Sequence, residues 1–252
     1  EIDKEKFLGA IECITAMCTP LIPCESGESL YIRPFMFSTE DNLGIKPSDT
    51  FKFMVIASPS GSYFYGKDTV NVVIEREAVR ACPGGTGSAK TGGNYAASLK
   101  SAMQAKKLGF MHRICLDSFK CEYIEEMSGM NFFAVIDGEL HTPSMTETIL
   151  NGVSRKSIIT LAEVMGVAVK ERNIKISELI EDIRTERCTE AFACGTAAII
   201  APIDSIGEKS GEIYRLKEPY GQLTSKLRKR LLAIQEGTEK SPFPEWHVKV
   251  EL

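Results

Sequence analysis

The dipeptide Asp137-Gly138 restricts the possible folds of this chain more than any other feature of its sequence. It separates the apolar run "NFFAVI" (residues 131–136) from the run "ELHT" (139–142). Asp-Gly between two strand-like runs is a strong signal for a two-residue hairpin turn, because both turn residues need positive φ. The two runs are therefore predicted to pair as antiparallel neighbours, and their sheet is predicted to be mixed or antiparallel.

Helix-like and strand-like segments interleave along the rest of the chain. Helices are predicted at residues 1–17, 94–108, 153–165, 177–186 and 221–237. Strands are predicted at residues 30–37, 51–59, 70–81, 113–118, 131–136 and 167–174, and on both sides of a turn within 190–203. This order indicates an α+β fold, in two domains joined by the turn-rich segment "SPSGSYFYGKD".

Several local signals refine these elements. Asp3 and Ser177 are candidate N-caps, because their side chains can accept hydrogen bonds from free helical amides. Gly109 and Gly166 suit the left-handed position that follows a helix. The run "FKFMVIASP" (51–59) is apolar enough to be predicted as a buried strand.

Composition limits the class of protein. The chain has 252 residues and a net charge of −4, so neither nucleic acid nor an anionic membrane is expected as its main partner. No apolar run approaches the roughly 18 residues of a membrane-spanning helix. The eight cysteines form no C-x-x-C pair, and most lie in apolar runs. Buried thiols in a reducing, intracellular setting are therefore expected rather than a disulfide framework, and no metal is expected.

The segment "GGTGSAKTGGNYAASL" (84–99) places a single lysine, Lys90, in a glycine-rich turn. The phosphate-binding pattern G-x-x-x-x-G-K-[ST] does not fit, because Ser88-Ala89 precede the lysine where that pattern requires glycine. A covalent amine is a second reading, since glycines let the backbone approach a carbonyl cofactor closely. A flexible surface loop is the third, and spacing alone leaves these last two open.

Three further segments each have a functional and an ordinary interpretation. "IEEMSGMNFF" offers Glu125 and Glu126 as buried acids or as solvated turn residues. "LNGVSRKSII" starts a helix whose free amides suit an anion, or which Ser154 simply caps. "ACGTAAII" is a second glycine-threonine turn or a plain hairpin. Together they supply what pyridoxal phosphate needs: an amine, a carboxylate for the ring nitrogen, hydroxyls, and amides for the phosphate.

These segments, with "SLYIRP" upstream, resemble the branched-chain aminotransferases of class IV (fold-type IV), over the whole chain to "WHVKV". The resemblance implies an enzyme that uses pyridoxal 5′-phosphate to move amino groups from leucine, isoleucine and valine to 2-oxoglutarate. Such an enzyme serves the biosynthesis and catabolism of these amino acids, with amino acids and 2-oxo acids as its small-molecule partners. The resemblance also implies a homodimer and three parts: the remainder of a small N-terminal domain at 1–62, a linker at 63–69, and a large cofactor-binding domain at 70–252.

Site residues follow from the same resemblance. Lys90 matches the family's Schiff-base lysine, which also shuttles the substrate proton, and Tyr95 matches a tyrosine near the ring oxygen. Glu126, rather than Glu125, matches the acid that pairs with the ring nitrogen. The other cofactor-binding positions that the resemblance implies are Asn131, Leu150, Gly152, Val153, Ser154 and Thr196. The substrate-binding positions that it implies are Tyr31, Arg33, Tyr63, Gly129, Thr196 and Ala197.

The sequence departs from the family in two places. Nothing matches the family's "FEG" segment and the arginine that grips the cofactor phosphate, so we expect a truncated sequence or a shortened paralogue with an incomplete small domain. Asn151 stands where proline is usual. A D-amino-acid aminotransferase, an aminodeoxychorismate lyase and a non-catalytic protein are the alternatives, and "GGNY", "GMN" and "YIRP" argue against the first two. The cytoplasm is the default location, with an organelle as the alternative.

Overall fold

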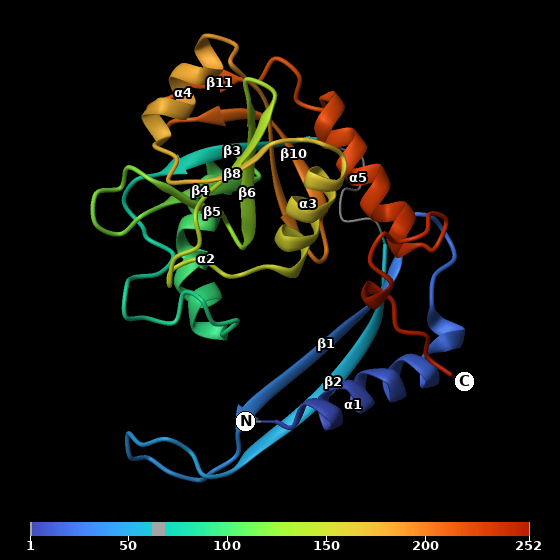
Figure 1. Cartoon of the computed structure of the whole chain (residues 1–252). Helices are drawn as coiled ribbons and strands as arrows, with labels where there is room; N and C mark the ends of the chain where they lie inside the picture. Colours follow the sequence, from blue (N-terminus) through green and yellow to red (C-terminus); the bar gives the residue numbers. More distant parts are fainter. Residues whose placement is uncertain (1, 62–68, 252) are drawn as a thin grey trace. The chain divides into compact units, whose positions relative to one another are not determined.

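The computed structural model describes residues 2–61 and 69–251 of the chain (Figure 1). Contacts divide it into two compact units: the described residues of Glu1–Tyr63 with those of Lys240–Leu252, and the described residues of Phe64–Glu239. The last twelve described residues therefore group with the N-terminal segment, whereas the sequence assigned them to the large domain. The predicted linker at 63–69 lies outside the described residues except for Thr69. The α+β class is confirmed.

The first unit contains one helix and a two-stranded sheet. Helix α1 (Lys4–Met17) begins after Asp3, whose Oδ1 accepts hydrogen bonds from the amides of Glu5 and Lys6 at 2.9 and 3.2 Å, so the predicted N-cap is confirmed. Strands β1 (Ser29–Ser38) and β2 (Phe51–Ser60) are antiparallel. The prediction that β2 is buried is wrong: each of its residues is exposed or half-buried. The strand pairs with β1 and contacts α1. Two 3₁₀ turns complete the unit, η1 (Thr19–Leu21) and η2 (Pro244–Trp246).

The second unit is built on a nine-stranded mixed sheet. Its strands are β3 (Val70–Glu75), β4 (His112–Leu116), β5 (Ile124–Met127), β6 (Met130–Ile136), β7 (Glu139–Thr142), β8 (Val169–Glu171), β9 (Cys188–Gly195), β10 (Ile199–Gly207) and β11 (Ile213–Arg215). Because β9 pairs with both β6 and β10, six strands close into a ring in the order β10-β3-β4-β5-β6-β9. The pairs β10–β3, β3–β4 and β7–β8 are parallel, and the others are antiparallel. The hairpin at Asp137-Gly138 joins β6 to β7 with φ of 51° and 80°, as predicted.

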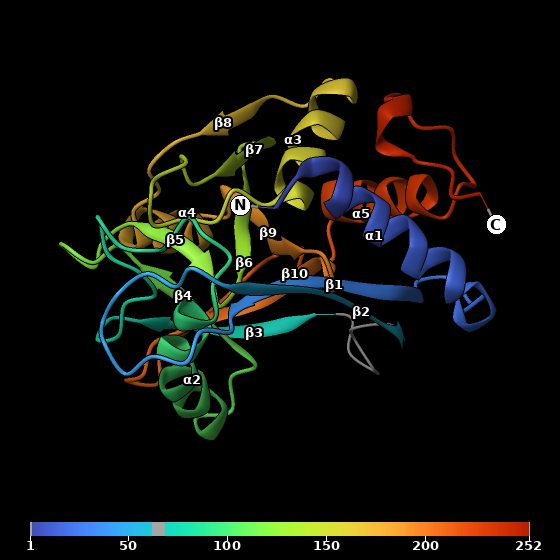
Figure 2. The ribbon, with the colours of Figure 1, turned by 90° about the horizontal axis from the view of Figure 1, so that it is seen from below.

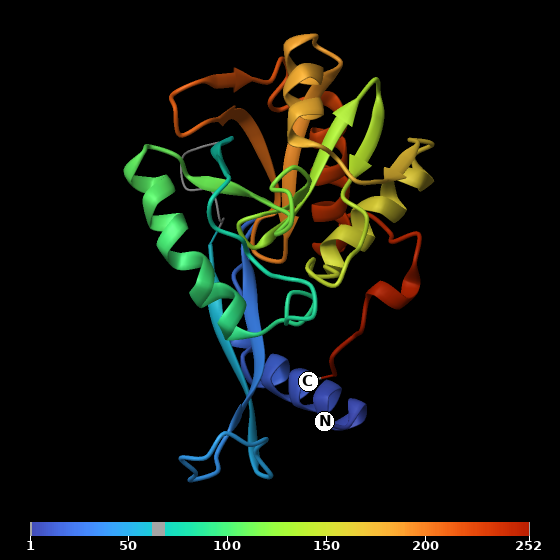
Figure 3. The same cartoon turned by 90° about the vertical axis from the view of Figure 1, so that its left-hand side faces the viewer.

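Four helices cover this sheet. They are α2 (Gly92–Lys107), α3 (Val153–Val164), α4 (Ile176–Arg184) and α5 (Gln222–Gln235). Helix α2 contacts β3 and β4, on the side of the sheet opposite α3 and α5, as Figures 2 and 3 both show. Gly109 and Gly166 follow α2 and α3 with the expected positive φ. Ser177 is not an N-cap: α4 begins one residue earlier, after Lys175, with no side-chain cap.

Buried apolar residues from β3, β4, β6, β9, β10 and α4 form one core cluster, which includes Val72, Ile74, Ile114 and Phe132. Only three of the eight cysteines are buried, namely Cys115, Cys188 and Cys194, so the expectation that most would be buried is wrong; the others lie on α1 or in loops. Among the described residues, no helix combines the length and apolar character that crossing a bilayer requires.

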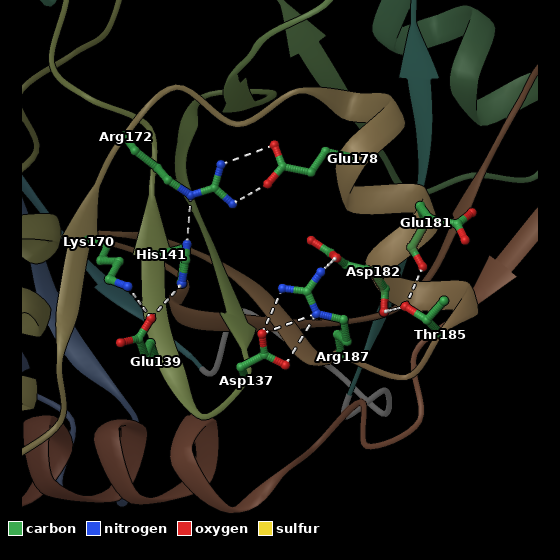
Figure 4. Close-up of polar contacts among 10 residues, drawn as sticks. All are labelled: Asp137, Glu139, His141, Lys170, Arg172, Glu178, Glu181, Asp182, Thr185 and Arg187. Atoms are coloured by element: carbon green, nitrogen blue, oxygen red, sulfur yellow. Dashed lines mark hydrogen bonds and ion pairs between the residues drawn. The ribbon is translucent and has the colours of Figure 1, made fainter.

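A charged network ties β7, β8 and α4 together at one edge of the sheet (Figure 4). The Arg172 guanidinium donates from Nε to Nδ1 of His141 at 2.8 Å and from Nη1 and Nη2 to the carboxylate of Glu178 at 3.1 and 2.8 Å. Lys170 and His141 both face Glu139, at 2.5 and 3.6 Å. Burial and the charge of Arg172 lower the pKa of His141, so its imidazole is held neutral as an acceptor.

Candidate functional site

The loop that carries Lys90 is held in place. Asn94, in the first turn of α2, donates from Nδ2 to the carbonyls of Thr86 and Ala89 at 2.7 and 2.9 Å, and its Oδ1 accepts from the Thr86 hydroxyl at 2.8 Å. The exposed Lys90 lies just after these anchors, and its Nζ donates to Oη of Tyr95 at 3.1 Å. The glycine-rich stretch is therefore a fixed turn that presents an accessible amine beside a phenol.

Gly87 packs this loop directly against a second segment. A Cβ atom at Gly87 would lie 2.5 Å from Cα of Thr148 and 2.7 Å from Cβ of Ala81, so only glycine fits there. Thr148 begins the stretch that leads through Leu150 to Gly152. The lysine loop and the predicted phosphate-binding turn are thus in backbone contact, although about 60 residues of chain separate them.

Strand pairing places Glu126 in a row of side chains on one face of the sheet. Cys115 pairs with Glu126, Glu126 with Asn131, and Asn131 with Cys194, and residues paired across strands share a face. Glu126 is 2% exposed. Its Oε1 accepts from the amide of Leu150 at 2.7 Å, and the same oxygen lies 3.2 Å from Nη2 of Arg80.

Burial raises the pKa of Glu126 to about 7, against the opposing effects of the Arg80 guanidinium and the Leu150 amide. Both of its polar contacts are made by Oε1, and no described residue donates a hydrogen bond to Oε2. A buried carboxylate with one free oxygen can accept a hydrogen bond from a protonated ring nitrogen. This arrangement fits pyridoxal phosphate.

A β-bulge sets the position of the neighbouring acid, Glu125. Leu116 pairs with Ile124 and Cys115 with Glu126, so β5 contains one more residue than β4 at this point. Glu125 is 7% exposed; its Oε1 accepts from the Thr148 hydroxyl, and its buried Oε2 has no partner among the described residues. Burial raises the pKa of Glu125 as well. The alternative that both acids are solvated turn residues is therefore wrong.

Asn131 and Gly152 fix the start of α3. Asn131 donates from Nδ2 to the carbonyl of Leu150 at 2.9 Å, and a Cβ atom at Gly152 would lie 2.2 Å from Oδ1 of Asn131. Gly152 is the N-cap residue, and no side chain caps this helix, so the alternative interpretation, in which Ser154 caps it, is wrong. The amides of the first turn, at Val153 and Ser154, thus have no side-chain acceptor, which suits them to an anion.

The remaining predicted positions of the second unit lie in two turns. Thr196 and Ala197 are exposed in the turn between β9 and β10, which ends at Ile199 with a φ of 58°. Positive φ is strained in a β-branched residue, and such strain gathers at functional turns. Gly129, between β5 and β6, lies under the ring of Tyr95: a Cβ there would be 3.3 Å from Cε1.

The other three predicted substrate-binding residues are Tyr31, Arg33 and Tyr63, from the N-terminal part of the chain. Tyr31 and Arg33 both lie on β1, and Arg33 donates from Nη2 to Oη of Tyr31 at 3.1 Å. Tyr63 lies outside the described residues. The substrate-binding roles of these three residues stay predictions.

Sequence reasoning missed Arg80, which joins the parts of the site. Its buried Nη2 donates to the carbonyl of Gly87 at 2.9 Å and to that of Thr148, and it pairs with Glu126. A charged residue at the end of the apolar run "VNVVIEREAVRA" was the available signal. The pattern gave no reason to separate it from the exposed charges of the same run.

Comparison with known proteins agrees with this geometry. The family model described as amino-transferase class IV matches residues 10–206. The chain is 39% identical over 249 residues to a probable branched-chain-amino-acid aminotransferase of Streptomyces coelicolor, covering 98% of this chain and 69% of that protein. It is 40% identical over 252 residues to branched-chain-amino-acid transaminase 1 of Bacillus subtilis, covering 99% of this chain and 70% of that protein.

Solved structures show the same fold. The crystal structure of the branched-chain amino acid aminotransferase of Escherichia coli matches with a TM-score of 0.79 and 26% identity, over 97% of this chain and 76% of that one. The T.th. branched-chain amino acid aminotransferase with pyridoxamine 5′-phosphate matches with a TM-score of 0.77 and 25% identity, over 97% and 74%. The family match covers well over half of the chain, and this chain belongs to the class IV aminotransferases.

Proposed function

We propose that this chain transfers amino groups, with pyridoxal 5′-phosphate, from branched-chain L-amino acids to 2-oxoglutarate. One observation carries the proposal: Arg80 contacts the Lys90 loop, the buried Glu126 and the segment that leads into α3, and Glu126 also binds that segment. The relatives' names support the branched-chain substrates. The solved structure with pyridoxamine 5′-phosphate supports the cofactor.

Each part of the site has a role in this proposal. Lys90 would hold the cofactor through its ε-amine. The free Oε2 of Glu126 would accept a hydrogen bond from the protonated ring nitrogen of the cofactor. The amides of Val153 and Ser154, with the Thr196 hydroxyl, would bind the phosphate. When bound, pyridoxal phosphate supplies an electron sink for negative charge at the substrate's α-carbon.

The chain's own residues supply positioning and proton transfer. Lys90 Nζ would take the proton from the α-carbon as general base and, as general acid, would deliver it to the cofactor carbon that bears the substrate nitrogen. The hydroxyl of Tyr95, 3.1 Å from that nitrogen, can orient the amine and exchange a hydrogen bond with it. The turn amides at Thr196 and Ala197 would hold the substrate carboxylate. An apolar pocket separates leucine, isoleucine and valine weakly, because one methylene is worth about 1–3 kcal/mol.

Borohydride reduction with pyridoxal phosphate, followed by peptide mapping, tests the covalent site. We expect one phosphopyridoxyl adduct, on Lys90, which is lost in Lys90→Ala and kept in Lys100→Ala. Lys100 is a matched control because it is another exposed lysine, on α2. Adducts scattered over surface lysines would overturn the proposal.

A transfer assay then tests the substrates. The wild-type chain should form 2-oxo acids from all three branched-chain L-amino acids with 2-oxoglutarate, and none from D-leucine. Transfer from the D-amino acid alone would favour a D-amino-acid aminotransferase instead. The homodimer and the cytoplasmic location stay predictions, of which sedimentation tests the first and fractionation the second.

A further inference from the structure

The bulge in β5 gives Glu125 a carboxyl group that the proposed reaction does not use. Glu125 is buried, although less completely than Glu126; its Oε1 accepts a hydrogen bond from Thr148, and its Oε2 has no partner among the described residues. A buried carboxyl that lacks a partner for one oxygen is destabilising, because that oxygen has lost its hydrogen bonds to water without replacement. Such a group calls for an explanation beyond packing.

The contacts of Glu125 lead back to Glu126 by two routes. Thr148 donates its hydroxyl to Glu125 and accepts at its carbonyl from Nη2 of Arg80, and that same nitrogen pairs with Glu126 at 3.2 Å. Glu126 in turn binds the Leu150 amide, two residues after Thr148. Two consecutive acids therefore bind the same short segment. The guanidinium of Arg80 pairs with Glu126 and acts on Glu125 through its charge, without a hydrogen bond to it.

We propose that Glu125 is a positioning residue that controls the ionisation of Glu126, because the two carboxyls share Arg80 and the segment from Thr148 to Leu150. If both are ionised, two buried negative charges lie near the one buried guanidinium of Arg80. Like charges that share one site cannot both ionise freely, and such a pair loses its protons in two separate steps. The role rests on the proposed function only in that Glu126 is the acid facing the ring nitrogen.

The surrounding charges support this reading. Arg80 favours the ionised form of both acids, Asp117 at the end of β4 opposes ionisation of Glu125, and Lys90 favours ionisation of Glu126. The nearby thiols of Cys115 and Cys194 stay neutral because burial raises the pKa of both, that of Cys115 to about 11. Glu125 is therefore the acidic neighbour that opposes the ionisation of Glu126.

Carbon-13 NMR of the glutamate side-chain carboxyls, in the full chain without added cofactor, tests the coupling directly. In the wild type we expect two linked steps, with that of Glu126 near pH 7. In Glu125→Gln, whose side-chain oxygen can still accept from Thr148, Glu126 should titrate at lower pH, with its proton dissociation constant increased at least threefold. Half a pKa unit corresponds to about that factor.

Reciprocity makes the test specific. Linkage requires that the two wild-type pKa values together exceed the sum of the single pKa values left in Glu125→Gln and Glu126→Gln, and the excess is the coupling between the two acids. Glu122→Gln is the matched control: it removes the same charge three residues away, at a half-exposed position paired with Lys175, and should leave Glu126 unmoved.

A third variant keeps the test valid if the glutamine variants fold poorly. Thr148→Val preserves both charges but removes the hydrogen bond to Glu125, so Glu125 should hold its proton to higher pH and Glu126 should ionise at lower pH. An unmoved titration of Glu126 in both Glu125→Gln and Thr148→Val would overturn the inference. Since no cofactor is added, this result is separate from the adduct test: coupling without an adduct on Lys90 would defeat the proposed function and leave the inference standing.

Discussion

Two buried arginines of the second unit should respond in opposite ways to the same substitution. Arg113, on β4, is 0% exposed, and none of its guanidinium nitrogens has a hydrogen-bond partner among the described residues. Arg80 is nearly as buried but binds two carbonyls and Glu126. Methionine is similar in length to arginine and uncharged, so we expect Arg113→Met to stabilise the chain and Arg80→Met to destabilise it.

The sizes of the expected stability changes follow from the hydrogen bonds that the Arg113 guanidinium does not make. A guanidinium carries five N–H donors and cannot lose its charge, and unsatisfied buried donors cost about 1–3 kcal/mol each. Replacing buried charged groups by apolar ones of similar size has stabilised proteins by about 1–4 kcal/mol. We expect about 2 kcal/mol from Arg113→Met, or roughly 4–8 °C in Tm for a chain of this size. Arg80→Met leaves an ionised Glu126 unpaired and should cost about 3–5 kcal/mol.

Urea unfolding at pH 8, followed by far-ultraviolet circular dichroism, measures both variants. That pH keeps Glu126 largely ionised, since its pKa is about 7. Circular dichroism is the right signal because four of the five described α-helices belong to the second unit, whereas the single tryptophan, Trp246, belongs to the first. A loss of more than about 1 kcal/mol in Arg113→Met would refute the reasoning, because it would show that the guanidinium has a partner in solution.

Two further predictions concern other parts of the second unit. Gly87→Ala should lower the unfolding free energy by several kcal/mol in urea, because its Cβ would lie 2.5 Å from the backbone of Thr148. Gly93→Ala is the control: a Cβ there has nothing within 4 Å, so the change should be neutral or stabilise by up to about 1 kcal/mol. Equal effects of the two variants would contradict the packing argument. The pKa of His141 is lowered in the folded state, so the neutral imidazole contributes fully to the unfolding free energy above about pH 6.5. This contribution falls as the pH decreases below that value. In His141→Asn, which can still accept from Arg172, the unfolding free energy should decline less between pH 7 and 5; parallel curves would count against this role.

Local sequence signals predicted the elements of the fold well where their cause is local. The Asp137-Gly138 turn needs only two residues that tolerate positive φ, and the cap at Asp3 needs only its own side chain and the amides of Glu5 and Lys6. The prediction that β2 is buried failed because burial depends on what covers a strand, and composition does not report that. Ser177 failed as a cap because α4 begins at Ile176, two residues before the start that a cap at Ser177 would require.

In the candidate site, too, features with a local cause could be predicted and features that depend on distant contacts could not. Lys90, Tyr95 and Glu126 lie in short segments that resemble a known family, and the structure brings Lys90 beside Tyr95. Arg80 and Thr148 could not be found in this way, because their contacts join residues 7 to 68 positions apart. The bulge at Glu125 is equally invisible in sequence, since it arises from the mismatch in residue number between β4 and β5.

The buried charges around Glu126 form a balanced set only in one protonation state. Arg80, Arg113, Glu125 and Glu126 sum to zero when both acids are ionised, and the thiol of Cys115 feels Arg113, Glu126 and Arg80. Protonation of one acid leaves this region with a net positive charge, and that is unfavourable for a ring nitrogen that must itself bear a proton. We therefore expect ionisation of Glu126 to favour binding of the proposed cofactor. Burial makes that ionisation depend on pH near neutrality, and Glu125 adds to the effect by opposing the ionisation of Glu126.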